Sequence, residues 1–203
     1  MTLTDAHTHR RDGATPDAVV QIEPDEALPA AGRFSTGVHP WHSAQAAELW
    51  PKVEAMATDS RIVAIGECGL DRRRGAPLPE QTELFLRHVS LAERLGKPLI
   101  VHCVGAWAEL LALHRHARPR MPWMVHGFRG KPQLARQLLD AGMHISLGER
   151  FNPATAAIIP AGRLHIETDT SERPLAEIAA AVAAARAAVR AERESGARGG
   201  NKE

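Results

Sequence analysis

The sequence predicts an α/β fold, a compact (β/α)8 TIM barrel with reduced helices in its first third. Eight short apolar runs rich in β-branched residues follow one another along the 203-residue chain, and helix-patterned segments separate the later ones. Strand–helix alternation indicates a parallel sheet, and eight strands suit a closed barrel. The chain is shorter than the ~250 residues typical of such barrels, and its first two runs lie too close together for a crossover helix. We therefore expect early helices to be missing.

The expected elements follow in order along the chain. Strands are expected at residues 2–9, 18–24, 34–40, 62–70, 98–104, 122–128, 144–149 and 163–169. Helices with an apolar stripe are expected at residues 79–96, 106–117 and 131–142. A long Ala-rich helix after the last strand is expected to end near Ser195. Residues 1–195 thus form one expected domain, and residues 196–203 are expected to be a flexible polar tail.

The composition of the chain limits the classes of protein to which it can belong. Hydrophobic residues make up 44% of the chain, enough for one substantial core, and the formal net charge of +1 neither favours nor excludes nucleic acid. Cys68 and Cys103 lie far apart in apolar settings, which indicates a reducing compartment rather than a disulfide framework. The sequence shows neither a membrane-length apolar run nor a signal-peptide pattern. We expect a cytoplasmic protein that does not bind membranes.

Metal-competent side chains fall near the carboxyl ends of the expected strands. Six donors lie there on five strands: His7, His9, Glu67, His102, His126 and Asp169. In a barrel these strand ends meet at one rim, where active sites are built. Histidines scattered through a core would not fall repeatedly at the same strand end, so we expect a metal site. Six further histidines are not expected to bind metal: His42, His88, His114, His116, His144 and His165.

The donor types narrow the choice of ion. Nitrogen and carboxylate donors without thiolates suit zinc, manganese, iron, cobalt or nickel, and magnesium at weaker affinity. Four histidines and two carboxylates exceed the needs of one tetrahedral ion, so two ions are expected, roughly 3.5–4 Å apart. Related barrel hydrolases bridge their metals with a carboxylated lysine on the fourth strand. The corresponding position here is Glu67, which we expect to be the bridge.

Six motifs together resemble a known family. DAHTHR, STGVHPW, AIGECGLD, LIVHC, VHGFRG and IETD occur in this order between about residue 4 and residue 170. They are similar to the successive motifs of the TatD family of metal-dependent deoxyribonucleases. This resemblance implies a TIM barrel of the metal-dependent hydrolase type with two divalent ions (zinc, manganese or magnesium). It also implies hydrolysis of DNA, which some members of the family trim from a 3′ end.

The resemblance also implies a role for each site residue. One ion would be held by His7, His9, Glu67 and Asp169, and the other by Glu67, His102 and His126. His39, in GVHP, would not be a ligand but would contact the scissile phosphate or assist the leaving group. Asp169 would also accept the proton of the attacking water. The expected catalytic residues are therefore Asp169, His39 and Glu67.

Basic residues near this rim are candidates for binding phosphate. Arg129 and Lys131 precede the start of an expected helix, where backbone amides and the helix dipole favour anions. Arg72 follows AIGECGLD on the same side, although a solvated loop is an equal alternative. Trp41 is expected to be a core anchor rather than a base-stacking platform, and Asp71 is assigned no catalytic role.

The sequence departs from the family pattern in regions that recognise substrate. The segment between His9 and Gly37 is short, LIVHC is not followed closely by an arginine, and the proline expected soon after Asp169 is delayed to Pro174. DNA or another phosphodiester remains the expected substrate. The alternative is hydrolysis of an amide or ester, including aminoacyl esters on RNA, and a less favoured one is a non-catalytic metal-binding protein. The missing early helices leave a flank that a second subunit would cover, so a monomer or weak homo-oligomer is expected.

Overall fold

The computed structural model describes residues 3–12 and 14–199. In these residues seven parallel strands form one sheet in sequence order, each paired with the next. They are β1 (Val19–Gln21), β2 (Arg33–Thr36), β3 (Ile62–Asp71), β4 (Leu99–Val104), β5 (Trp123–Val125), β6 (His144–Leu147) and β7 (Leu164–Ile166). The predicted parallel sheet is confirmed, and the order lets all strand carboxyl ends meet at one rim.

The N-terminal segment completes the ring between β7 and β1. It was expected to be a regular strand, but it is joined by isolated parallel bridges, Asp5 to Ile166, Thr8 to Val20 and Thr8 to Asp169. The Thr8 N–H donates to the Val19 carbonyl at 3.1 Å, and the Ala6 N–H donates to the Ile166 carbonyl at 2.9 Å. Because this segment bonds to both edges of the sheet, it takes the place of the eighth strand and leaves no open edge there.

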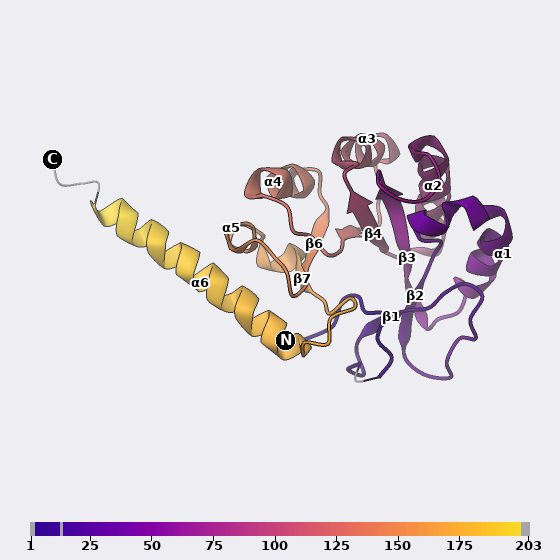
Figure 1. The fold of residues 1–203 in the computed structure, drawn as a ribbon, viewed down its shortest axis with the longest axis horizontal. Helices are drawn as coiled ribbons and strands as arrows, with labels where there is room; N and C mark the ends of the chain where they lie inside the picture. The colour runs from indigo at the N-terminus through magenta and orange to yellow at the C-terminus, as the bar shows by residue number, and fades with distance from the viewer. Residues whose placement is uncertain (1–2, 13, 200–203) are drawn as a thin grey trace.

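The helices cover the later strands and are sparse at the start, as predicted. They are α1 (Ala46–Met56), α2 (Leu78–Leu95), α3 (Trp107–Ala117), α4 (Pro132–Asp140), α5 (Pro153–Ala156) and α6 (Leu175–Gly199). Within the described part of the chain, no helix precedes β2. The far end of α6 projects past α5, away from the strands (Figure 1). This helix continues to Gly199, beyond the expected end at Ser195, and residues 200–203 of the expected tail lie outside the described residues.

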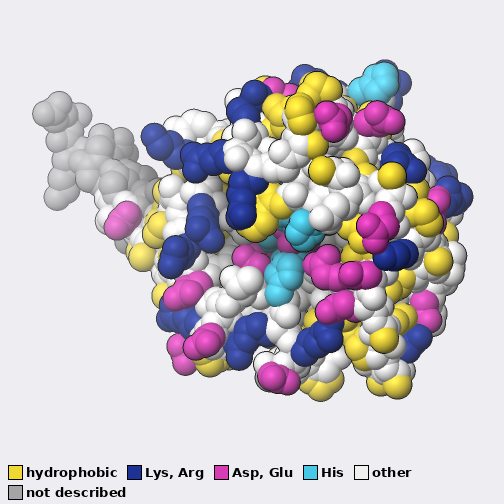
Figure 2. Space-filling model, turned by 45° about the vertical axis from the view of Figure 1, so that its right-hand side comes forward, with side chains coloured by type: hydrophobic (Ala, Val, Ile, Leu, Met, Phe, Trp, Pro, Cys, Tyr) yellow, Lys and Arg dark blue, Asp and Glu magenta, His cyan; other side chains and the backbone are white. Residues whose placement is uncertain are grey.

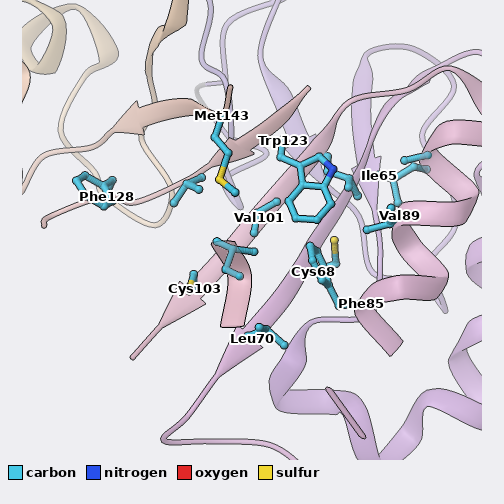
Figure 3. Packing of buried hydrophobic residues seen from close by; sticks show 14 of the residues in the cluster. Ile65, Cys68, Leu70, Phe85, Val89, Val101, Cys103, Trp123, Phe128 and Met143 are labelled. Carbon is cyan, nitrogen blue, oxygen red and sulfur yellow. The ribbon is translucent and has the colours of Figure 1, made fainter. Parts of the chain in front are cut away.

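The core lies between the sheet and the helices. Trp123 of β5 and Phe85 of α2 are each 1% exposed, and their rings meet edge to face at 5.0 Å. Figure 3 shows Cys68 and Val101 beside this pair, on the sheet side of α2. Both cysteines belong to this core and are free, as expected. Because neighbouring residues of a strand face opposite sides, Glu67 and His102, next to the two cysteines, point into the barrel.

Two glycines allow β3 to approach β4 closely around Glu67. Gly66 and Gly69 have φ values of +139° and +145°, which side chains rarely adopt. A Cβ at Gly66 would lie 2.4 Å from the Ile100 carbonyl oxygen, and one at Gly69 would lie 2.0 Å from that of His102. The register of the two strands also shifts between Ile65 and Cys68, which re-aims the side chain between them.

A buried histidine of α2 holds the segment that presents His39. The His88 Nε2 accepts the Val38 N–H at 2.9 Å, and its Nδ1 donates to the Leu84 carbonyl at 2.8 Å. The neutral ring therefore carries its proton on Nδ1. His88 is fully buried and packs edge to face against Trp50, with ring centroids 4.8 Å apart.

The stability of the fold should fall in mild acid because of His88. Burial lowers the pKa of this imidazole to about 4, whereas an unfolded histidine has a pKa near 6.5. Its stabilising contribution is complete above pH 6.5 and is lost as pH falls toward 4, since only the unfolded chain then takes up the proton. We expect about 2 kcal/mol less stability at pH 5 than at pH 7 from this group.

Urea unfolding of wild type and His88→Gln at the two pH values measures this contribution. His88→Gln should be less stable at pH 7 but should lose less stability between pH 7 and 5. His116→Gln, which alters an exposed histidine of α3, should keep the wild-type dependence. Equal pH dependence in wild type and His88→Gln would contradict the prediction.

Candidate metal centre

The expected ligands converge on Glu67, whose two carboxylate oxygens face different histidines. Its Oε2 lies 3.3 Å from the His7 Nε2 and 3.1 Å from the His9 Nε2. Its Oε1 lies 2.8 Å from the His102 Nδ1 and 2.7 Å from the His126 Nε2. The Glu67 side chain is only 4% exposed. A carboxylate placed in this way can bridge two ions, with one pair of histidines for each.

Asp169 joins the His7 and His9 side of the cluster. Its Oδ1 lies 3.7 Å from the His9 Nε2 and 3.9 Å from the His7 Nε2. The backbone fixes this position, because the Asp169 N–H donates to the His7 carbonyl and the His9 N–H donates to the Asp169 carbonyl. Asp169 has a φ of +53°, in the left-handed region that aspartate tolerates better than most residues.

His39 lies at the same centre, but its hydrogen bonds favour a role other than metal ligand. Its Nδ1 accepts the Trp41 N–H at 3.2 Å, so the neutral ring carries its proton on Nε2. Burial lowers the pKa of His39, which keeps the ring neutral. By distance alone His39 could share an ion with Glu67 and His102, since its Nε2 lies 3.0 Å from the Glu67 Oε1 and 3.3 Å from the His102 Nδ1. However, an Nε2 that carries the proton cannot bind a metal. It can instead donate a hydrogen bond to a substrate oxygen.

Two carboxylates stand behind the histidines that face the Glu67 Oε1. The Asp71 Oδ2 lies 3.3 Å from the His102 Nε2, and the Glu167 Oε1 lies 3.5 Å from the His126 Nδ1. Each carboxylate favours a proton on the outer ring nitrogen and leaves the inner lone pair directed at the centre. Sequence reasoning gave Asp71 no such role and missed Glu167. The signal for Glu167 was its place two residues before Asp169, on the same side of an extended segment.

The charges of the cluster compensate one another. Burial alone would raise the pKa of Glu67, but His126, His102 and His39 hold it well below its usual value. Burial alone would lower the pKa of His126, but Glu67 and Glu167 raise it well above its usual value.

Unpartnered donor atoms in the cluster also fit a bound cation. Both ring nitrogens of His7 are buried without a hydrogen-bond partner in the described residues, although buried polar groups normally have one. Buried nitrogen and carboxylate donors of this kind are the ligands that zinc and manganese prefer. The residues present therefore fit divalent ions.

Removing either supporting carboxylate should weaken metal binding. We expect Asp71→Asn and Glu167→Gln each to lower the affinity for Zn²⁺ or Mn²⁺ by about 10–100-fold. Without the carboxylate, His102 or His126 respectively loses its fixed tautomer and orientation. Isothermal titration with each metal measures this. Asp140→Asn, at the exposed carboxyl end of α4, is the matched control. Wild-type affinity in both variants would show that the two carboxylates do not orient ligands.

Trp41 is not the core anchor that was expected. It is 41% exposed and lines the pocket that contains Glu67, His39 and His102. Its indole N–H donates to the Asp71 Oδ2 at 2.6 Å, and the Arg74 guanidinium lies 3.8 Å from its ring centre. These polar contacts hold the ring at the rim instead of in the core. Among the histidines not expected to be ligands, only His42 lines this pocket.

The three basic candidates have different surroundings. Arg129 lines two hollows beside the centre, one of about 300 Å³ and one of about 420 Å³. Arg72 donates to the Gly105 carbonyl and forms an ion pair with Glu109. Lys131 is exposed at the start of α4 and lines neither hollow. Sequence reasoning did not single out Arg150, which lines the smaller hollow with Arg129.

No helix in the described part of the chain has the length and apolarity needed to cross a membrane.

The profile of a family described as TatD related DNase matches residues 5–194. The 3′-5′ ssDNA/RNA exonuclease TatD of Cronobacter turicensis is 40% identical over 155 residues, which cover 68% of this chain and 57% of that protein. The protein of the same name from Edwardsiella piscicida is 35% identical over 161 residues, with 74% and 60% covered. The chain thus spans less than two thirds of these relatives.

Solved structures share the fold. A TatD homologue from Escherichia coli K12, YJJV, superimposes with a TM-score of 0.71 at 21% identity, over 85% of this chain and 81% of that one. A TatD family hydrolase from Entamoeba histolytica gives a TM-score of 0.64 at 20% identity, over 82% and 73%. The TIM-barrel prediction is confirmed by this likeness and by the ring of parallel segments. The family profile, which spans nearly the whole chain, shows that the protein belongs to the TatD related DNase family.

Proposed function

We propose that this protein is a divalent-metal-dependent hydrolase that cleaves phosphodiester bonds of DNA by attack of an activated water. The observation that carries the proposal is the division of the Glu67 oxygens between two groups of histidines. Two ions on such a bridge lower the pKa of a water and neutralise charge on a transferring phosphoryl group. His7, His9, Glu67 and Asp169 would hold one ion, and Glu67, His102 and His126 the other.

The remaining chemistry falls to Asp169 and His39. The Asp169 side chain is 30% exposed, whereas Glu67 is 4% exposed, so Asp169 can meet both solvent and substrate. In this proposal Asp169 would orient the attacking water and accept its proton. The His39 Nε2–H faces the same centre and would donate to an oxygen of the substrate, where it stabilises developing negative charge.

The surroundings favour a nucleic-acid strand over a small ester. A pocket for a small substrate would be closed and would hold one anchoring cation. Here Asp169 lines the metal pocket and also both open hollows that contain Arg129. The relatives described as ssDNA/RNA exonucleases support the same substrate class.

Activity of metal-reconstituted protein tests the proposal. A 3′-labelled single-stranded DNA and bis(p-nitrophenyl) phosphate should both be hydrolysed, and a chelator should abolish both reactions. Binding of about two ions without turnover of either substrate would sink the phosphodiesterase assignment and redirect the search to acyl substrates. A protein that binds no metal would overturn the candidate centre itself.

We further propose a cytoplasmic protein that is a monomer or a weak homo-oligomer. Both cysteines are free and buried, as is usual in reducing compartments. Light scattering across a concentration series tests the oligomeric state, and a stable larger assembly would contradict it.

A further inference from the structure

A hollow of about 300 Å³, the β6 hollow, lies beside the metal pocket. It is lined by residues that follow β5, β6 and β7, among them Arg129, Glu149, Arg150, Asp169 and Ser171. Asp169 also lines the metal pocket, so the β6 hollow adjoins the proposed reaction centre. Figure 2 shows both basic and acidic side chains around the histidines at the centre of the molecule.

Two carboxylates of the β6 hollow face the histidines of the metal centre. The Asp169 Oδ1 lies 3.7 Å from the His9 Nε2, and the Glu167 Oε1 lies 3.5 Å from the His126 Nδ1. The Glu167 Oε1 also accepts the Gly127 N–H at 2.6 Å. These two acidic groups therefore belong to the metal centre, although they form part of the wall of the hollow.

Three other charged side chains of the β6 hollow have no charged partner. Arg129, Glu149 and Arg150 are exposed, and none of them forms an ion pair in the described residues. Two guanidinium groups and a carboxylate that line one hollow without neutralising one another suit a ligand with both acceptor and donor groups. A phosphate alone does not match the set, because the Glu149 carboxylate repels it.

A hydrogen bond holds the Glu149 carboxylate at the wall of the hollow. The Ser171 hydroxyl donates to the Glu149 Oε2 at 2.8 Å, and the Ser171 Oγ accepts the Arg173 N–H at 3.1 Å. Arg10 donates to the Ser171 carbonyl at 3.1 Å, which fixes the loop after Asp169. Each carboxylate oxygen has two lone pairs, so both oxygens of Glu149 can still accept hydrogen bonds from a ligand.

Among the four bases of DNA, guanine matches these side chains. Its N1–H and N2–H₂ are neighbouring donors that the two oxygens of a carboxylate can accept, and its O6 and N7 accept from one guanidinium. Adenine and cytosine each offer a single amino group with no second donor beside it, and thymine offers only N3–H. A base presents all of these groups to a protein only when it is unpaired, as in a single strand.

We propose that the β6 hollow binds a guanine of a single strand at the metal centre, with Glu149 accepting from N1–H and N2–H₂ and Arg150 donating to O6 and N7. Arg129 also lines the neighbouring hollow of about 420 Å³ and is left to bind a phosphate. The inference rests on the proposed function and adds a base preference to it. A bidentate contact of this kind favours the matching base by about tenfold or more.

Binding without turnover tests the base preference. Protein kept free of metal by chelator is titrated into dye-labelled single strands of thymine that carry guanine, inosine or 7-deazaguanine at every third position, and fluorescence anisotropy gives the dissociation constants. Wild type should bind the guanine strand about tenfold more tightly than an all-thymine strand. Inosine lacks the N2 amino group and 7-deazaguanine lacks N7, so strands with either base should bind with intermediate affinity.

Two variants assign the preference to its residues. Glu149→Gln should abolish the preference for guanine over inosine, and Arg150→Gln should abolish the preference for guanine over 7-deazaguanine. Glu172→Gln is the matched control, since it removes an exposed carboxylate of the loop after Asp169 that lines neither hollow nor the metal pocket. This control should keep both wild-type preferences.

The same strands separate a failure of this inference from a failure of the proposed function. Equal affinity of wild type for the guanine and all-thymine strands, or a wild-type preference for guanine over inosine in Glu149→Gln, would overturn the inference. Equal kcat/KM of the metal-reconstituted protein on all strands would also overturn it and leave the proposed function intact. Hydrolysis of none would overturn the proposed function, and the binding ratios would then decide on Glu149 and Arg150 alone.

Discussion

On the proposed two-ion mechanism, Glu67→Gln should lower the rate of phosphodiester hydrolysis by about 10³-fold or more and reduce bound metal from two ions to one or none. Gln keeps the size of the side chain but offers one carbonyl oxygen, so it cannot face both histidine pairs as an acceptor. Two ions held there would supply several kcal/mol of stabilisation to the charged transition state, and each 1.36 kcal/mol is tenfold in rate.

Measuring kcat/KM and metal content on the same samples shows whether activity and the second ion are lost together. Glu67 is buried at the rim of the barrel, and its N–H donates to the Gln21 side chain at 2.7 Å. Circular dichroism therefore checks that the variant is still folded. Asp140→Asn is the control for the removal of a carboxylate charge. Retention of two ions and of activity within tenfold of wild type would show that Glu67 is not the bridge.

The sequence predicted the ring and the donor cluster because both depend on local patterns. Alternation within a strand directs Glu67 and His102 inward and the two cysteines outward, and the parallel order brings the strand ends together. The inward direction of these side chains and the common rim of strand ends do not depend on contacts between loops. The same reasoning located the N-terminal segment in the ring, although its pairing is limited to isolated bridges.

What the sequence did not predict depends on contacts between distant residues. Arg72 is engaged by Glu109, 37 residues away, and is therefore less available to phosphate than Arg150, which no pattern singled out. Trp41 stays at the rim because its indole N–H reaches Asp71, 30 residues away. Such partners are set by loop conformations, which the periodicity of helices and strands does not describe.

Asp169→Asn should lower kcat by about 10²–10⁴-fold, the usual contribution of a general base, with little change in stability. Asparagine tolerates the left-handed backbone at this position as aspartate does, so the variant removes the proposed proton acceptor and keeps the fold. Asp169→Ala should be inactive as well and less stable than Asp169→Asn by about 1 kcal/mol, because alanine fits a φ of +53° poorly. Steady-state kinetics and urea unfolding measure the two effects separately.

Arg118 also has a positive φ, and a comparison with Asp169 separates backbone strain at the metal centre from backbone strain elsewhere. Arg118 has a φ of +46° and ends α3, far from the metal centre. Arg118→Gly should stabilise the protein by about 1 kcal/mol and leave activity unchanged, since glycine is the preferred residue at such helix ends. Asp169→Gly should relieve the same kind of strain but abolish activity. If Asp169→Asn kept the wild-type kcat, the carboxylate would be neither proton acceptor nor essential ligand, and the left-handed backbone at Asp169 would serve only the closure of the ring.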